Sequence, residues 1–219
     1  MTKIDIFSGF LGAGKTTLIK KLIAEAYSGE KLVLIENEFG EINIDGGFLK
    51  ESGIEISEMS AGCICCSLVG DFNKALKEVV AQFHPDRILI EPSGVGKLSD
   101  VIVAVERTVD ECLGELKLNS YVTVADASKV KVYMKNFGEF YNNQIEAAGT
   151  IILSRTQKLS QEKLEAAAAA VCAMGLAGEI GWSRMAEGDG NSTYRNRIID
   201  AIYNMDGATL NGGAKYELR

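Results

Sequence analysis

The feature that most constrains the fold is a glycine-rich segment near the amino terminus, flanked by two contrasting patterns. Residues 9–16 read GFLGAGKT and fit the phosphate-loop pattern G-x-x-x-x-G-K-[ST]. Residues 4–7 before it are typical of a short strand, and residues 16–26 after it have the apolar spacing of an amphipathic helix. This order predicts backbone N–H groups that surround a phosphate at a helix amino terminus. The alternative is a strand–turn–helix in which the glycines only form the turn.

The residues of this loop have different predicted roles. Small residues let the backbone curl around a phosphate, and they are Gly9, Gly12, Ala13 and Gly14. Lys15 is expected to reach the β and γ phosphates, and the hydroxyl of Thr16 is expected to bind Mg²⁺. The sequence therefore predicts a nucleoside triphosphate as ligand.

Alternating strand and helix patterns predict an α/β fold: a P-loop NTPase with a mostly parallel sheet and helices on both faces. The strands are expected at residues 31–37, 87–91, 119–127, 150–155 and 178–182, and residues 54–59 form a short alternating segment that leads into the cysteines. The helices are expected at residues 68–83, 98–105, 143–148, 159–174 and 193–205, the fourth starting at an N-cap, Ser160, and stopping at Gly175. A single domain is expected over residues 1–205, followed by a polar tail at 206–219.

Composition narrows the class of protein. The net charge of −7 and the lack of a basic stripe argue against a nucleic-acid partner. No signal peptide is expected, because Met1 leads directly into the phosphate loop, and the longest apolar stretch, residues 166–178, is too short to span a bilayer. Five cysteines are an odd number, which fits a reducing cytoplasm better than a disulfide framework.

Three of these cysteines fall within four residues, in the segment GCICC. Cys63, Cys65 and Cys66 predict a thiolate site for a soft or borderline metal such as Zn²⁺, Co²⁺ or Ni²⁺. The fourth ligand has to come from elsewhere: a carboxylate (Glu38, Glu41 or Glu58), a water or a partner protein. An incomplete ligand set suits metal transfer. The alternative is that the cysteines are small buried side chains.

Two further segments are candidates for contact with the γ phosphate. Glu91 ends an apolar strand, where P-loop NTPases place a carboxylate for Mg²⁺, and the N–H of Gly94 can sense the γ phosphate. The acidic stretch 38–47 can order over the phosphate as a switch, with Asp45 as a second group near Mg²⁺. The alternatives are a solvated strand end for Glu91 and a plain surface loop for residues 38–47.

The other polar candidates are weaker. His84 is the only histidine and is expected to cap a helix or lie on the surface. Cys112 and Cys172 are expected to be packing residues, and Asp126 ends a strand that can face the nucleotide.

The phosphate loop, NEFGE-x-x-ID, GCICC and E-x-x-G, in this order and spacing, resemble the CobW-type metallochaperone GTPases over residues 1–160. These are relatives of the urease and hydrogenase nickel-insertion GTPases and include nitrile hydratase activators. The resemblance implies switches at residues 38–45 and 91–94. It also implies phosphate and Mg²⁺ binding by Gly9, Gly12, Gly14, Lys15, Thr16 and Thr17, and metal capture by Cys63, Cys65 and Cys66 with Glu38 or Glu41.

Two departures from the family pattern concern the base and the chain length. At the guanine-reading element [NT]-K-x-D this chain has Ser154, Arg155, Thr156 and Gln157. The neutral amide of Gln157 offers one acceptor and one donor group, which fits adenine at least as well as guanine, and Arg155 can stack on the base. Both GTP and ATP are therefore candidate ligands. The family's usual C-terminal domain is also not expected in this chain.

These features predict a nucleotide-hydrolysing metallochaperone that assists a client metalloenzyme. Lys15, Thr16 and Glu91 are its predicted catalytic groups, and slow intrinsic turnover is expected because no residue is an evident positioner of water. A homodimer that shares a metal is a further hypothesis. The alternatives are a small-molecule P-loop kinase and a non-enzymatic metal or redox sensor that binds nucleotide.

Overall fold

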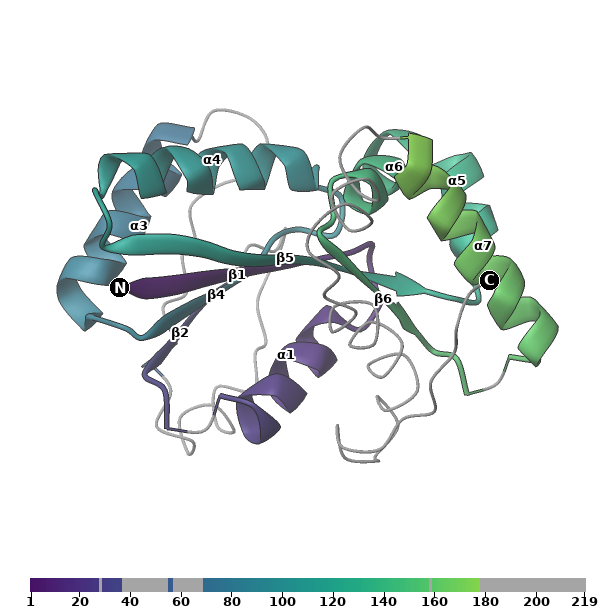
Figure 1. The fold of residues 1–219 in the computed structure, drawn as a ribbon, viewed down its shortest axis with the longest axis horizontal. Coiled ribbons are helices and arrows are strands. Elements are labelled where there is room, and N and C mark those ends of the chain that lie inside the picture. The colour runs from purple at the N-terminus through teal and green to yellow at the C-terminus, as the bar shows by residue number, and fades with distance from the viewer. Residues whose placement is uncertain (28, 37–54, 57–68, 158, 178–219) are drawn as a thin grey trace, which may run out of the picture.

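A single parallel sheet organises the molecule (Figure 1). The computed structural model describes residues 1–27, 29–36, 55–56, 69–157 and 159–177. Within these ranges six strands pair in the order β3-β2-β4-β1-β5-β6, and every pair is parallel. The strands are β1 (Thr2–Ser8), β2 (Leu32–Glu36), β3 (Glu55–Ile56), β4 (Arg87–Glu91), β5 (Leu116–Asp126) and β6 (Thr150–Ser154).

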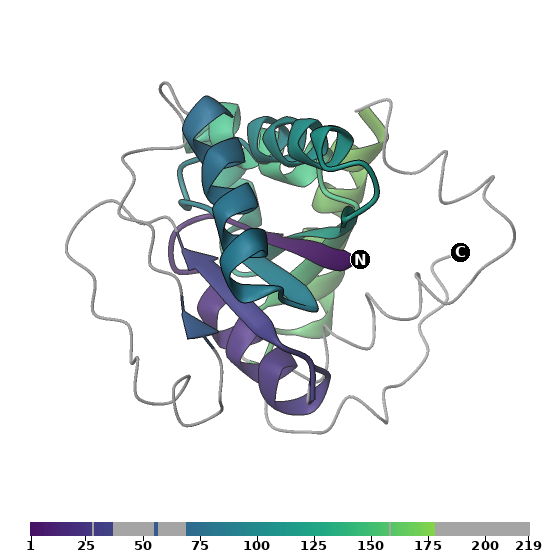
Figure 2. The ribbon, with the colours of Figure 1, turned by 90° about the vertical axis from the view of Figure 1, so that its left-hand side faces the viewer.

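Helices cover both faces of this sheet. They are α1 (Lys15–Glu25), α3 (Val69–Phe83), α4 (Leu98–Glu111), α5 (Val130–Asn136), α6 (Gly138–Glu146) and α7 (Gln161–Ala177). Figures 1 and 2 show α3 and α4 on one side and α1 on the other, with α5, α6 and α7 grouped beside β6. No helix in the described ranges is long and apolar enough to cross a membrane. The predicted α/β fold is confirmed.

Alternation along the central strands explains why both faces need helices. Ile4 and Ile6 of β1 pack in one cluster with buried residues of α3 and α4. Phe7 belongs to the opposite cluster, where it packs with Leu18 and Ile19 of α1. Since both faces of a central parallel strand are apolar, helices have to cover both of them and exclude water.

Several predicted boundaries are wrong. Helix α4 extends to Glu111 instead of residue 105, β5 begins at Leu116 instead of residue 119, and α5 was not predicted. Gly175 is not a helix stop, because α7 continues through it to Ala177. A single glycine costs a helix only about 1 kcal/mol, and the burial of Val171 and Met174 in the preceding turn favours continuation.

Other expectations are met or lie outside the described residues. The amide N–H of Lys163 donates to Ser160 Oγ at 3.4 Å, so Ser160 is an N-cap of α7, as predicted. The expected strand 178–182, the expected helix 193–205 and the tail 206–219 lie outside the described residues. The proposed domain limits therefore stay a prediction.

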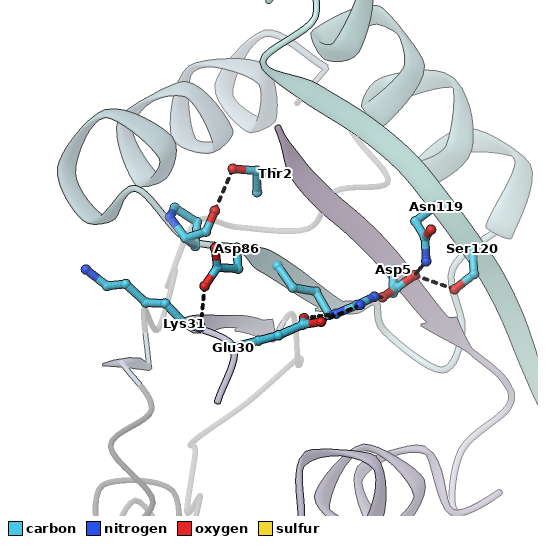
Figure 3. A network of polar contacts seen from close by, with 9 residues as sticks. Thr2, Asp5, Glu30, Lys31, Asp86, Asn119 and Ser120 are labelled. Atoms are coloured by element: carbon cyan, nitrogen blue, oxygen red, sulfur yellow. Dashed lines mark hydrogen bonds and ion pairs between the residues drawn. The ribbon is translucent and has the colours of Figure 1, made fainter. Parts of the chain in front are cut away.

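A polar network joins strands near the amino-terminal edge of the sheet (Figure 3). Asp5, fully buried in β1, accepts hydrogen bonds from Asn119 Nδ2 at 2.7 Å and Ser120 Oγ at 2.6 Å, and its other oxygen pairs with the Arg87 guanidinium. The same guanidinium binds both carboxylate oxygens of Glu30, at 2.6 and 3.1 Å. The buried carboxylate of Asp5 is thus both ion-paired and hydrogen-bonded, which offsets the cost of removing its charge from water.

A register shift between β1 and β5 makes this network possible. Ile4 pairs with Leu118 but Asp5 pairs with Ser120, so Asn119 is the extra residue of a β-bulge. Such a bulge turns two consecutive side chains toward one partner. Next to the network, the ring of Tyr27 lies 4.2 Å from the Arg87 guanidinium carbon, and desolvation by burial raises the pKa of Tyr27 to about 12.

Candidate functional site

The predicted phosphate loop lies between the end of β1 and the start of α1. Three of its glycines have positive φ: 143° at Gly9, 70° at Gly12 and 102° at Gly14. The helix begins at Lys15, and its N-cap, Gly14, offers no side-chain hydrogen bond. The first turn of α1 therefore meets the loop with backbone N–H groups that no capping side chain satisfies, as anion binding requires.

Lys15, Thr16 and Glu91 converge beside this loop. The Oγ1 of Thr16 lies 3.0 Å from both carboxylate oxygens of Glu91, and Lys15 Nζ lies 3.8 Å from one of them. Glu91 is the last residue of β4, which lies next to β1 in the sheet, so strand order brings together residues 75 positions apart. The side chains of Lys15 and Glu91 are 8% and 6% exposed, which strengthens their attraction.

Two glycines allow close approach of neighbouring chain segments. A Cβ on Gly9 would lie 2.3 Å from the carbonyl oxygen of Val124 in β5. A Cβ on Gly94 would lie 2.8 Å from the backbone nitrogen of Leu11 in the phosphate loop. Gly94 therefore packs directly against the phosphate loop, and its predicted contact with the γ phosphate stays a prediction.

The segment aligned with the base-reading element touches the loop from the other side. Ser154 Oγ donates to the carbonyl of Ala13 at 2.6 Å, and Arg155 Nη2 donates to the carbonyl of Gly12 at 2.8 Å. Arg155 also lies 3.5 Å from the Asp126 carboxylate. Gln157 is exposed, and Thr17 is exposed in the first turn of α1. Ser154 and Arg155 thus stabilise the phosphate loop by hydrogen bonds to its backbone carbonyls, which the sequence did not predict.

Phe10 anchors the loop and was missed by the sequence analysis. Its ring lies 4.7 Å from that of Tyr133 and 4.8 Å from that of Phe137, centroid to centroid. Tyr141 packs edge-on at 6.2 Å, and burial raises its pKa above the ordinary value. The one sequence signal that could have indicated such an anchor is a large apolar residue inside a glycine-rich loop.

All predicted protein ligands of the transition metal lie outside the described residues. These are Glu38, Glu41, Glu58, Cys63, Cys65 and Cys66, together with Asp45 of the predicted switch. Among the described residues no group of three or more His, Cys, Asp or Glu side chains is placed to hold a metal. Glu36, which the sequence analysis passed over, ends β2 and is the register partner of Glu91.

The surroundings of the weaker candidates indicate structural roles for their side chains. His84 is exposed just after α3, with φ of 45°, as expected for a residue that ends a helix. Cys112 packs against the core beside α3 and α4. Asp126 accepts the backbone N–H of Ser128 at 2.9 Å and so shapes the turn after β5.

Comparison with known proteins places the fold and motifs in a family. A family model described as "CobW/HypB/UreG, nucleotide-binding domain" matches residues 3–178. The chain belongs to this family. The resemblance that the motifs indicated is thereby confirmed, and so is nucleotide binding as the general property of the domain.

Individual relatives of this CobW/HypB/UreG domain bear names that mention zinc. Zinc chaperone YeiR of Escherichia coli (strain K12) is 32% identical over 166 residues, which cover 76% of this chain and 50% of YeiR. Zinc-regulated GTPase metalloprotein activator 1 of Schizosaccharomyces pombe (strain 972 / ATCC 24843) is 32% identical over 74% of this chain and 40% of that protein. The chain spans about half the length of the curated relatives it matches.

A solved structure supports the same fold. The crystal structure of Zn(II)-bound YjiA GTPase from E. coli superposes with a TM-score of 0.56 at 24% identity. The match covers 78% of this chain and 54% of that chain. At this identity the likeness concerns the fold, so the chemistry has to be argued from the residues described above.

Proposed function

We propose that this protein is a nucleoside-triphosphate-hydrolysing switch that holds a transition metal and delivers it to a client metalloenzyme. The observation that carries the hydrolytic part is the contact of Thr16 and Lys15 with Glu91 beside the phosphate loop. A hydroxyl, a carboxylate and an ammonium group at one point form the set that a Mg²⁺-bound triphosphate needs.

The residues at this point fit Mg²⁺ by the chemistry of their donors. Mg²⁺ prefers oxygen ligands and keeps several waters, and Thr16 and Glu91 supply a hydroxyl and a carboxylate oxygen to hold it directly or through water. When bound, the ion neutralises negative charge on the phosphates. Lys15 would leave Glu91 for the β and γ phosphates, and the N–H groups at the start of α1 would hold the β phosphate.

GTP is the proposed nucleotide. Support comes from the names of relatives, one of which is a GTPase metalloprotein activator. Gln157 has one acceptor and one donor group where the family pattern has an aspartate, and this favours ATP as much as GTP. The two nucleotides therefore have to be compared directly.

Zn²⁺ is the proposed cargo, and Cys63, Cys65 and Cys66 with Glu38 or Glu41 are the proposed ligands. Support comes from the thiolate preference of Zn²⁺ and from relatives named zinc chaperones. The chain enters this region from Glu36, which is the register partner of Glu91. Glu91, the proposed Mg²⁺ carboxylate, is thus one strand away from the segment that leads to the cysteines. Slow intrinsic turnover and a metal-sharing homodimer remain part of the proposal.

The decisive experiment measures Zn²⁺ affinity with and without a nonhydrolysable triphosphate, using GTP and ATP analogues in parallel. We expect the affinity to differ between the two states, because a ligand that binds both states equally shifts neither. A Cys65→Ser variant should lose this nucleotide-dependent difference in Zn²⁺ affinity while it keeps its affinity for the nucleotide. Equal Zn²⁺ affinities would remove the switch. Transfer of the phosphoryl group to a small-molecule acceptor, with no phosphate released in the absence of that acceptor, would favour a kinase.

A further inference from the structure

Helix α6 holds the loop that follows β4. This loop, residues 92–97, contains Gly94 and a tight turn in which the N–H of Gly96 donates to the carbonyl of Ser93 at 3.0 Å. From α6, Gln144 Nε2 donates to the carbonyls of Gly94 at 3.0 Å and Gly96 at 2.8 Å. One amide group thus binds the backbone at Gly94, which packs against the phosphate loop, and at Gly96.

Neighbouring side chains of α6 reinforce this contact at the start of α4. Asn143 Oδ1 accepts the backbone N–H of Ser99 at 3.2 Å, and its Nδ2 donates to Ser99 Oγ at 3.0 Å. Lys97 and Glu139 form an ion pair at 3.0 Å. The loop is therefore fixed at its carboxyl end, and Gln144 is the contact that reaches its centre.

The burial of Gln144 makes its contact specific. The side chain is fully buried, Gly94 and Gly96 are buried as well, and Gln144 Oε1 has no hydrogen-bond partner in the described part of the chain. Turning the amide over would place Oε1 against two carbonyl oxygens, so the chemistry of the acceptors fixes its orientation. Loss of the amide would leave two buried carbonyls without this donor.

We propose that Gln144 is a positioning residue that holds the N–H of Gly94 ready for the terminal phosphate of a bound triphosphate. The inference rests on the proposed function. A loop that is already ordered costs less to bind than one that must be ordered on binding. Because the N–H of Gly94 is proposed to contact only the terminal phosphate, the benefit falls on the triphosphate and not on the diphosphate. Gln144 therefore sets the preference for triphosphate over diphosphate.

The test compares Gln144→Met with Thr108→Val in the full chain. Met matches the size of Gln without its donors. Thr108 is a fully buried residue of α4 whose Oγ1 donates to the Ala104 carbonyl at 3.0 Å, away from the loop. We measure the ratio of Kd for the diphosphate to Kd for a nonhydrolysable triphosphate. Gln144→Met should lower this ratio about tenfold, since the two buried hydrogen bonds of Gln144 are lost, and Thr108→Val should leave it unchanged.

Hydrogen exchange supplies a second reading that needs no nucleotide. Backbone amides of residues 94–98 should exchange faster in Gln144→Met than in the wild type, while those of β1 should not change. Equal weakening of both nucleotides, or unchanged exchange in the loop, would overturn the inference. A wild type without preference for triphosphate would instead overturn the proposed function, and the inference with it.

Discussion

The two ends of the parallel sheet both carry a buried carboxylate beside a cation, but they treat it differently. Near the amino-terminal edge, Asp5 receives hydrogen bonds from Asn119, Ser120 and Arg87, all supplied by neighbouring strands (Figure 3). At the carboxyl-terminal edge, Glu91 meets Thr16 and Lys15, which belong to the start of a helix behind a glycine-rich loop.

This difference separates a structural network from the proposed binding site. The partners of Asp5 lie on strands that cannot move without opening the sheet, so its charge is neutralised permanently. The partners of Glu91 include a hydroxyl and a long ammonium side chain, which under the proposed function exchange Glu91 for a metal ion or a phosphate. Ligands in parallel α/β sheets bind beyond the carboxyl ends of the strands, and here the exchangeable carboxylate lies at that end.

The largest expected effect is on stability, from Asp5→Ala. The variant leaves the Arg87 guanidinium buried without one of its two carboxylates, and loss of one partner of a buried pair costs about 3–5 kcal/mol. Urea denaturation measures the loss. Asp86→Ala is the matched control at the same edge, where an exposed carboxylate accepts one backbone hydrogen bond, and it should cost about 1 kcal/mol. Similar losses in the two variants would contradict a specific role for the Asp5 network.

The second effect is on activity, from Lys15→Ala. Loss of a cation aimed at the reacting phosphates should slow hydrolysis roughly 10²–10³-fold, a typical cost of removing one electrostatic contact. The free energy of unfolding should fall by less than in Asp5→Ala, since Glu91 keeps Thr16. Phosphate release and urea denaturation are measured on the same samples, with Lys20→Ala on the same helix as control. Normal hydrolysis in Lys15→Ala would make this edge structural too.

The smallest effect is a pH dependence at the amino-terminal edge, tested with Glu30→Gln. The hydrogen bond from Arg87 lowers the pKa of Glu30 below its ordinary 4.5. A lowered pKa in the folded state adds stability above the unfolded pKa, and this is lost as pH falls through the folded value. Since Glu30 is partly exposed, Glu30→Gln should be less stable by about 0.2–1 kcal/mol at neutral pH. The two proteins should converge in acid, and a difference that stays constant with pH would contradict the pairing.

The sequence alone predicted the parts of the site that are written as short, contiguous patterns. Gly9 to Thr16 could be recognised because phosphate binding dictates both residue types and spacing, and Glu91 and Gly94 because they follow an apolar strand. The fold class followed from alternating periods. Helix ends were less secure, since α4 and α7 extend beyond the predicted limits where burial outweighs local preference.

Contacts between distant segments were decided only by the tertiary structure. Arg87 pairs with Asp5 across 82 positions, Ser154 reaches Ala13 across 141, and Gln144 reaches Gly94 across 50. Arg87, Asp5 and Gln144 stand in no sequence pattern, and the pattern that contains Ser154 concerns the base and not the phosphate loop. A ligand selects residues by spacing along the chain, which a sequence displays, whereas packing selects them by proximity, which exists only after strands and helices have come together.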